Sequence, residues 1–151
     1  MPWVGVRSQA PRPARGTAQK GCHVQQRSMR FPADIAHIAS VRDFAAQAAD
    51  DLGSNVDRDD LALVVGELAA NAAVHQSGEA ELVVRVHPDG RIDIEVADED
   101  PTIPAPIDSA PWDLEGHRGL HLVSVVSHSW GVTPEGTGKR IWARLAPPPP
   151  G

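Results

Sequence analysis

One segment of the sequence, residues 61–75, limits the folds open to this chain more than any other. It is almost wholly apolar or small, and its only polar side chains are Glu67, Asn71 and His75. Their spacing of four predicts a helix with one narrow polar stripe, because an α-helix has 3.6 residues per turn. A helix this apolar must be covered over most of its surface, so we expect it to lie inside a layered domain.

Two more segments have helical periodicity. Apolar residues recur at spacings of three and four from Ile35 to Leu52, and Gly53 follows, which predicts an amphipathic helix that ends there. The acidic residues of the segment 57–60 suit the N-terminus of the helix at 61–75, where carboxylates complement the helix dipole. A shorter helix is predicted from Gly119 to Ser127.

Four segments have the composition of strands. Leu82–Val86 and Arg91–Ala97 flank the turn-like sequence 87–90, and Trp130–Val132 and Ile141–Leu145 predict a second hairpin. The order is two helices, two strands, one helix and two strands. It predicts an α+β fold, namely a two-layer α/β sandwich with the helices on one face of a mixed, mostly antiparallel sheet.

The length and the distribution of charge predict the domain organisation. A chain of 151 residues forms one ordinary domain, which we place at residues 30–146. Residues 1–29 hold five basic and no acidic residues among many glycines and prolines, and we expect a disordered basic tail there. Residues 147–151 form a Pro-rich C-terminal tail. The sequence leaves open whether Met1 or Met29 is the true start.

The composition also excludes several classes of function. Residues 30–151 hold the other nine basic residues and all 20 acidic ones, which argues against binding of the folded part to nucleic acid. The single cysteine, Cys22, gives no disulfide framework, so a reducing compartment fits best. No apolar run is long enough to span a bilayer. We therefore expect a cytoplasmic protein that binds no membrane.

Strand parity singles out Asp98. Residues alternate between the two faces from Ile92 to Val96, so the apolar residues share one face and the acidic Asp93 and Glu95 share the other. Asp98 falls on the apolar face, and its carboxylate is expected to point toward the helix layer. The alternative is a turn or capping aspartate, because the residues that follow have turn composition.

A glycine-rich turn precedes the third helix. Gly116 and Gly119 allow backbone N–H groups to face outward at a helix N-terminus, where the partial positive charge favours phosphate, although a simple helix entry has the same composition. Residues 98–115 contain four prolines and no periodicity, so we expect a long exposed loop that acts as a mobile lid.

The polar stripe of the helix at 61–75 also has an alternative interpretation. It is equally compatible with an ordinary solvent-facing stripe on a half-buried helix.

Together these three motifs resemble a known superfamily. They are Glu67-Leu-x-x-Asn71-Ala-x-x-His75, Asp98-x-Asp100-x-x-x-Pro104 and Gly116-x-x-Gly119-Leu120-x-Leu-Val123, in the order and spacing of the N, G1 and G2 boxes of GHKL ATPases with the Bergerat fold. Within that superfamily the chain looks most like the small anti-sigma-factor serine/threonine kinases of bacteria, including the closing Trp130-Gly131 and 138–142 elements. The resemblance covers roughly residues 30–145, and the combination is more specific than any one box.

The resemblance implies a role for each motif residue. Glu67 would be the general base, Asn71 a ligand of the Mg²⁺ that accompanies ATP, and Asp98 the acceptor for the adenine amino group. Gly116 and Gly119 would hold the phosphates, and the remaining members of the nucleotide-binding set would be His75, Asp100, Pro104, Arg118 and Leu120. Of these, His75 and Arg118 would help to neutralise phosphate charge.

Two residues depart from the pattern of the family. Asp100 stands where a small residue is usual, and its negative charge is expected to tighten the loop or to hinder the nucleotide. Arg140 occupies the place where a threonine commonly supports the adenine end of the pocket. The expected effect is on nucleotide affinity and adenine geometry, because Glu67 and Asn71 are retained.

The resemblance implies a regulatory ATP-dependent kinase. We expect it to phosphorylate a serine or threonine on an anti-sigma-factor antagonist protein and to exchange partners with a sigma factor. The alternative is a non-catalytic ATP-binding module that sequesters a sigma factor or another regulator, although a pure binder would not need the base at Glu67. The catalytic half of a histidine kinase would require a dimerising helix with a phosphorylatable histidine, which we do not expect here. Whether the protein forms a homodimer is left open.

Overall fold

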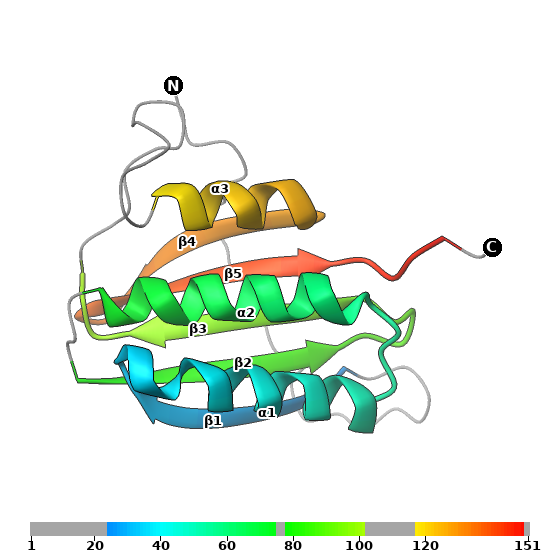
Figure 1. The fold of residues 1–151 in the computed structure, drawn as a ribbon, viewed down its shortest axis with the longest axis horizontal. Coiled ribbons are helices and arrows are strands. Elements are labelled where there is room, and N and C mark those ends of the chain that lie inside the picture. Colours follow the sequence, from blue (N-terminus) through cyan, green and yellow to red (C-terminus); the bar gives the residue numbers. More distant parts are fainter. Residues whose placement is uncertain (1–23, 75–77, 102–116, 150–151) are drawn as a thin grey trace.

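The computed structural model describes residues 24–74, 78–101 and 117–149 of the chain (Figure 1). Its strands and helices follow one another as β1 (Gln25–Pro32), a short 3₁₀ helix η1 (Ile35–His37), α1 (Ile38–Asp51), α2 (Arg58–Ala73), β2 (Glu79–Val86), β3 (Ile92–Asp98), α3 (His117–Val126), β4 (Ser129–Glu135) and β5 (Gly138–Leu145). All the helices lie on the same face of the sheet, so the predicted two-layer α+β architecture is confirmed (Figure 1).

The five strands form one sheet in the order β1-β2-β3-β5-β4. Each pair of neighbours is antiparallel, so the sheet formed by the described residues is purely antiparallel. The sequence had predicted a mixed, mostly antiparallel sheet, and the prediction is wrong in this detail. The reason is that β5 inserts between β3 and β4. Strands β3 and β4, which precede and follow α3 in the chain, run in the same direction, but they are not hydrogen-bonded to each other. Both predicted hairpins, β2–β3 and β4–β5, are present.

The first strand was not predicted. The expected disordered tail extended to residue 29, but residues 25–29 belong to β1, which pairs with β2 over its whole length. Only one face of this edge strand is covered. Phe31 is buried and Met29 packs against the core, whereas the alternate residues are polar and exposed. The apolar signal is therefore too sparse to be distinguished from an irregular polar segment.

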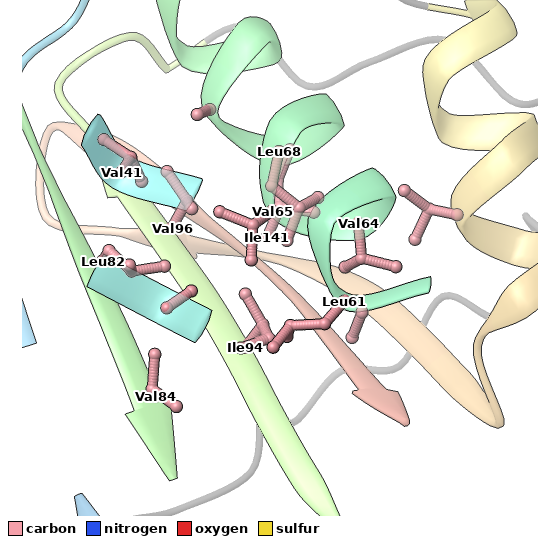
Figure 2. Close-up of a cluster of buried hydrophobic side chains, with 14 of the residues drawn as sticks. Val41, Leu61, Val64, Val65, Leu68, Leu82, Val84, Ile94, Val96 and Ile141 are labelled. Carbon is pink, nitrogen blue, oxygen red and sulfur yellow. The ribbon is translucent and has the colours of Figure 1, made fainter. Parts of the chain in front are cut away.

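The hydrophobic core lies between the helices and the sheet, with α2 over its centre. The buried residues of α2 face strands β3 and β5, as Figure 2 shows for Leu61, Val64, Val65 and Leu68 against Ile94, Val96 and Ile141. Helix α1 covers the side of the sheet formed by β1 and β2, and α3 lies on the side of β4 (Figure 1). No helix in the described part of the chain is long and apolar enough to cross a membrane.

The opposite face of the sheet contains a network of ion pairs. The carboxylates of Asp93 and Glu95 are almost fully buried there, and each has two basic partners: Arg144 and His87 for Asp93, and Arg85 and Arg140 for Glu95. A buried carboxylate is costly unless it is paired, so these basic residues are required where the acids are. The hydrogen bond to Asp93 raises the pKa of Arg144 above its usual value.

Candidate functional site

Helix α2 places Glu67 and Asn71 on one partly exposed side. The helix begins after Asp57, whose carboxylate accepts a hydrogen bond of 2.9 Å from the N–H of Asp60, and further acidic residues follow in the first turn. The apolar side of the helix is fixed against the sheet by burial of residues such as Leu68. Glu67 and Asn71 are left on a common stripe that is only partly buried, as their spacing predicted.

The carboxylate of Glu67 lies directly against Gly119 of the neighbouring helix α3. A Cβ atom added at Gly119 would overlap Oε2 of Glu67 and would lie 3.2 Å from its Cδ atom. The backbone of Gly119 is not in the left-handed region, so this glycine is needed for close approach and not for its conformational freedom. The structure therefore brings together two residues that the sequence placed in different motifs.

A pocket of about 320 Å³ opens beside Glu67. It is lined by Arg42 of α1 and by Asp59, Ala62, Leu63, Gly66 and Glu67 of α2. The side chain of Arg42 lies over Gly66, where an added Cβ would stand 2.7 Å from the Arg42 Nε atom. The lining of the pocket therefore combines apolar residues with one cationic and two anionic side chains, one of which is Glu67.

The side-chain oxygen of Asn71 is buried and has no hydrogen-bond partner among the described residues. A buried amide oxygen normally has a partner, because desolvating it without one costs about 1–3 kcal/mol. Amide oxygens are among the hard ligands that Mg²⁺ prefers. This orphaned oxygen, one helical turn from Glu67, therefore fits the Mg²⁺ that the sequence analysis assigned to Asn71.

Asp98 ends β3 on the face covered by the helices, as strand parity predicted, and it forms a buried ion pair with Lys139 of β5. The Lys139 Nζ atom lies 3.1 Å from Oδ2 of Asp98 and donates a hydrogen bond of 3.2 Å to Oδ1. Oδ1 also accepts a hydrogen bond of 2.9 Å from the N–H of Asp100, whose own carbonyl oxygen accepts one of 3.2 Å from Lys139. The side chains of Asp98 and Lys139 are only 1% and 2% exposed.

The close approach of β5 and the burial of the carboxylate both affect the pair of Asp98 and Lys139. A Cβ at Gly138 would overlap the carbonyl oxygen of Asp98, so the glycine lets β5 approach the end of β3 closely. Burial raises the pKa of Asp98 above its usual value, and the charge and hydrogen bond of Lys139 partly offset this effect. Asp98 is therefore a carboxylate held in fixed geometry by two donors from its own chain.

The residues meet at one end of the molecule. The C-terminal end of α2, the end of β3, the start of α3 and the β4–β5 turn all lie on the left in Figure 1. Leu120, one residue after Gly119, is buried in the core and anchors the start of α3. His75, Pro104 and Gly116 lie outside the described residues, as do most of the predicted lid at 98–115 and the side chain of Arg118.

The structure corrects the prediction for Arg140 and identifies a residue that the sequence analysis missed. Arg140 is on the opposite face of the sheet, where it pairs with Glu95 and Glu135. The residue opposite Asp98 in the strand register is Lys139. The signal for this was present in the sequence, because Ile141 belongs to the core and residue 139, two positions earlier, must share its face.

Comparison with known proteins agrees with this arrangement. Residues 31–145 match the family of histidine kinase-like ATPase domains. No curated protein matches the chain.

One solved structure with the same fold is "The crystal structure of the RsbU and RsbW domains of Rv1364c from Mycobacterium tuberculosis". The similarity has a TM-score of 0.54 at 16% sequence identity and covers 80% of this chain and 32% of that one. The present chain thus spans about a third of the solved one, and at this level of identity the similarity concerns the fold alone.

Proposed function

The chain belongs to the histidine kinase-like ATPase domain family, and from this membership we propose that it binds ATP with Mg²⁺ and phosphorylates a serine or threonine of another protein. The partner proposed is an antagonist of an anti-sigma factor, with exchange of a sigma factor, because the chain shares its fold with a structure that contains an RsbW domain. The observation that carries the kinase proposal is the position of Glu67 between Gly119 and an open pocket.

Glu67 is proposed to act as the general base. Its carboxylate would accept the proton of the acceptor hydroxyl while the hydroxyl oxygen forms a bond to the γ-phosphorus of ATP. The bond from the γ-phosphorus to the bridging oxygen would break, and ADP would leave. The pocket supports this role because Glu67 is one of its lining residues.

Asn71 and Asp98 are proposed to bind the two ends of the nucleotide. The buried and unpartnered Asn71 oxygen would be a ligand of Mg²⁺, which when bound screens the phosphate charge. Asp98 would accept a hydrogen bond from the adenine amino group. The first turn of α3, which contains Gly119, would present its backbone N–H groups to the phosphates, since these groups have no partners within the helix.

The pocket beside Glu67 is proposed as the entry site for the acceptor segment of the partner. Arg42 and Asp59 stand at its edge and are exposed, so they are available for ion pairs with a partner protein. Ala62 and Leu63 offer a small apolar contact. An acceptor loop with a hydroxyl residue flanked by both charges and an apolar side chain would suit this lining.

The test is transfer of labelled phosphate from γ-labelled ATP with Mg²⁺ to candidate antagonist proteins. Glu67→Gln keeps the size of the side chain and removes the base, so transfer should fall by about 10²–10⁴-fold while Mg·ADP binding is nearly unchanged. Asp43→Asn is the matched control, because it removes an exposed carboxylate of the helix layer that does not line the pocket.

Wild-type transfer by Glu67→Gln would exclude the base mechanism. If the wild-type protein binds Mg·ATP and transfers phosphate to no antagonist, the function is that of an ATP-dependent binding module that sequesters a regulator.

A further inference from the structure

Lys139 is an unusual residue to find near the start of β5, because its ammonium group is buried. The nearest acceptors are both carboxylate oxygens of Asp98 and the carbonyl oxygen of Asp100. A buried ion pair rarely adds stability compared with two apolar residues of similar volume. Lys139 supplies the counter-charge that the buried Asp98 carboxylate requires, and it does so next to the oxygens proposed to bind the base.

The pair presents an acceptor and a donor side by side. Oδ1 of Asp98 accepts both hydrogen bonds described above, from Asp100 and Lys139. Oδ2 lies 3.1 Å from the Lys139 Nζ atom, and because a carboxylate oxygen has two lone pairs it can still accept a hydrogen bond from a further donor. Lys139 has three ammonium protons, and its acceptors are one carboxylate, that of Asp98, and the carbonyl oxygen of Asp100. The strand register sets Asp98 directly opposite Lys139, and Gly138 keeps the two backbones close, so the relative position of the pair is fixed.

The Watson–Crick edge of adenine has the complementary order. Its 6-amino group is a donor, and the neighbouring ring nitrogen N1 is an acceptor. We propose that Lys139 is a second base-reading residue, which donates a hydrogen bond to N1 of the adenine whose amino group is held by Asp98. This inference rests on the proposed binding of an adenine nucleotide and adds to it a residue that determines specificity.

The same pair would reject guanine in that pose. Guanine presents its O6 acceptor to the Asp98 carboxylate and its N1–H donor to the Lys139 ammonium group, so both contacts would be repulsive. A site without the lysine would no longer repel the N1–H group of guanine. Lys139 should therefore increase the discrimination between adenine and guanine beyond what Asp98 alone provides.

The inference is tested by changing one atom of the ligand. Binding of ADP, 1-deaza-ADP and purine riboside 5′-diphosphate to the full chain with Mg²⁺ is measured by calorimetry. 1-Deaza-ADP has a C–H group in place of N1, and the purine nucleotide lacks the 6-amino group. Wild-type protein should bind 1-deaza-ADP about 10- to 100-fold more weakly than ADP, the range for a hydrogen bond to a charged group.

Two variants place the effect at Lys139. In Lys139→Met the ratio between ADP and 1-deaza-ADP should fall to about 1, whereas Lys139→Gln keeps an N–H donor and should retain part of the preference. The purine nucleotide should bind more weakly than ADP to the wild type and to both variants, because it tests Asp98. If Lys139→Met does not fold, the ratio between ADP and 1-deaza-ADP on Lys139→Gln, compared with the wild type, places the effect instead.

The outcomes separate this inference from the proposed function. Equal binding of ADP and 1-deaza-ADP to the wild type would overturn the role of Lys139 and leave the nucleotide site intact. Tighter binding of ADP to Lys139→Met than to the wild type would also overturn it, because the ammonium group would then compete with the base for Asp98. Failure of the wild type to bind any adenine nucleotide would reject both the proposed function and this inference.

Discussion

The close contact between Gly119 and Glu67 predicts a substitution that improves stability and impairs activity. Gly119 lies in the first turn of α3 and its φ is outside the left-handed region, so helix propensity alone favours alanine over glycine there. Gly119→Ala should stabilise the helix by about 0.5–1 kcal/mol. For a domain of this size, such a gain corresponds to a rise in Tm of about 2–5 °C.

The added methyl group would act on the carboxylate of Glu67. It overlaps Oε2, but it lies 3.2 Å from Cδ and 3.6 Å from Cβ of Glu67, so only the end of the side chain has to move. A displacement of about 1 Å restores ordinary van der Waals contact. Because a misplacement of that size costs about 10²-fold in rate, phosphoryl transfer should fall by about two orders of magnitude.

Three measurements on the same protein preparation check this prediction. They are urea unfolding for stability, transfer of labelled phosphate for activity, and calorimetry for the affinity of Mg·ADP, which should change little. Gly53→Ala is the control. It has nothing within 4 Å of an added Cβ but a φ of 82°, so alanine should cost about 1 kcal/mol of stability without affecting transfer.

Either of two results would refute the reasoning. A wild-type transfer rate in Gly119→Ala would mean that the position of the Glu67 carboxylate against α3 does not matter for catalysis. A loss of several kcal/mol of stability would mean that the contact is tightly packed and that the carboxylate has no room to turn.

Three further predictions follow from the buried polar groups. Asn71→Ala removes the orphaned oxygen, so ADP should bind more weakly than to the wild type and its affinity should lose most of its dependence on Mg²⁺, as measured by titrations with and without the metal. Asp98→Asn leaves the buried Lys139 ammonium group without a counter-charge and should destabilise the fold by about 3–5 kcal/mol in urea unfolding. The double variant Asp98→Asn/Lys139→Met removes that charge as well and should lose clearly less stability. An equal or larger loss in the double variant would contradict this. Burial raises the pKa of Asp98, so its carboxylate becomes protonated at a higher pH than that of an ordinary aspartate. As the pH is lowered, ADP affinity should therefore begin to fall before ordinary aspartates are protonated. Asp98→Asn should lack this pH-dependent loss of affinity.

Most of the helix layer and the central strands were predictable from the sequence because they bury one continuous face. The period of the apolar residues in α2 and in β3 survives in the fold, as Val65 and Ile94 illustrate. The stripe of Glu67 and Asn71 and the inward direction of Asp98 follow from the same periods. These predictions needed no tertiary information, since each depends on spacing within a single element.

Features that depend on contacts between distant segments were not predictable in this way. β1 has few apolar residues, and it is held by backbone hydrogen bonds to β2, which leave no trace in composition. The overlap that makes Gly119 necessary involves Glu67, a residue 52 positions earlier in the chain. Lys139 was missed because its partner, Asp98, is 41 residues away, and only the register of β3 with β5 makes the two neighbours.

The pairing of Asp98 with Lys139 changes how a substitution at Asp98 must be interpreted. An isolated base-binding carboxylate can be replaced and the lost affinity assigned to the lost hydrogen bond, but here the replacement also leaves a buried ammonium group unpaired. Weak nucleotide binding by Asp98→Asn is therefore expected whether or not Asp98 touches the base, because the variant is also less stable. Removing the 6-amino group from the ligand avoids this ambiguity, since the ion pair remains intact while the proposed contact is lost. If that removal weakens binding to the wild type but not to a folded Asp98→Asn/Lys139→Met double variant, the contact with Asp98 is direct.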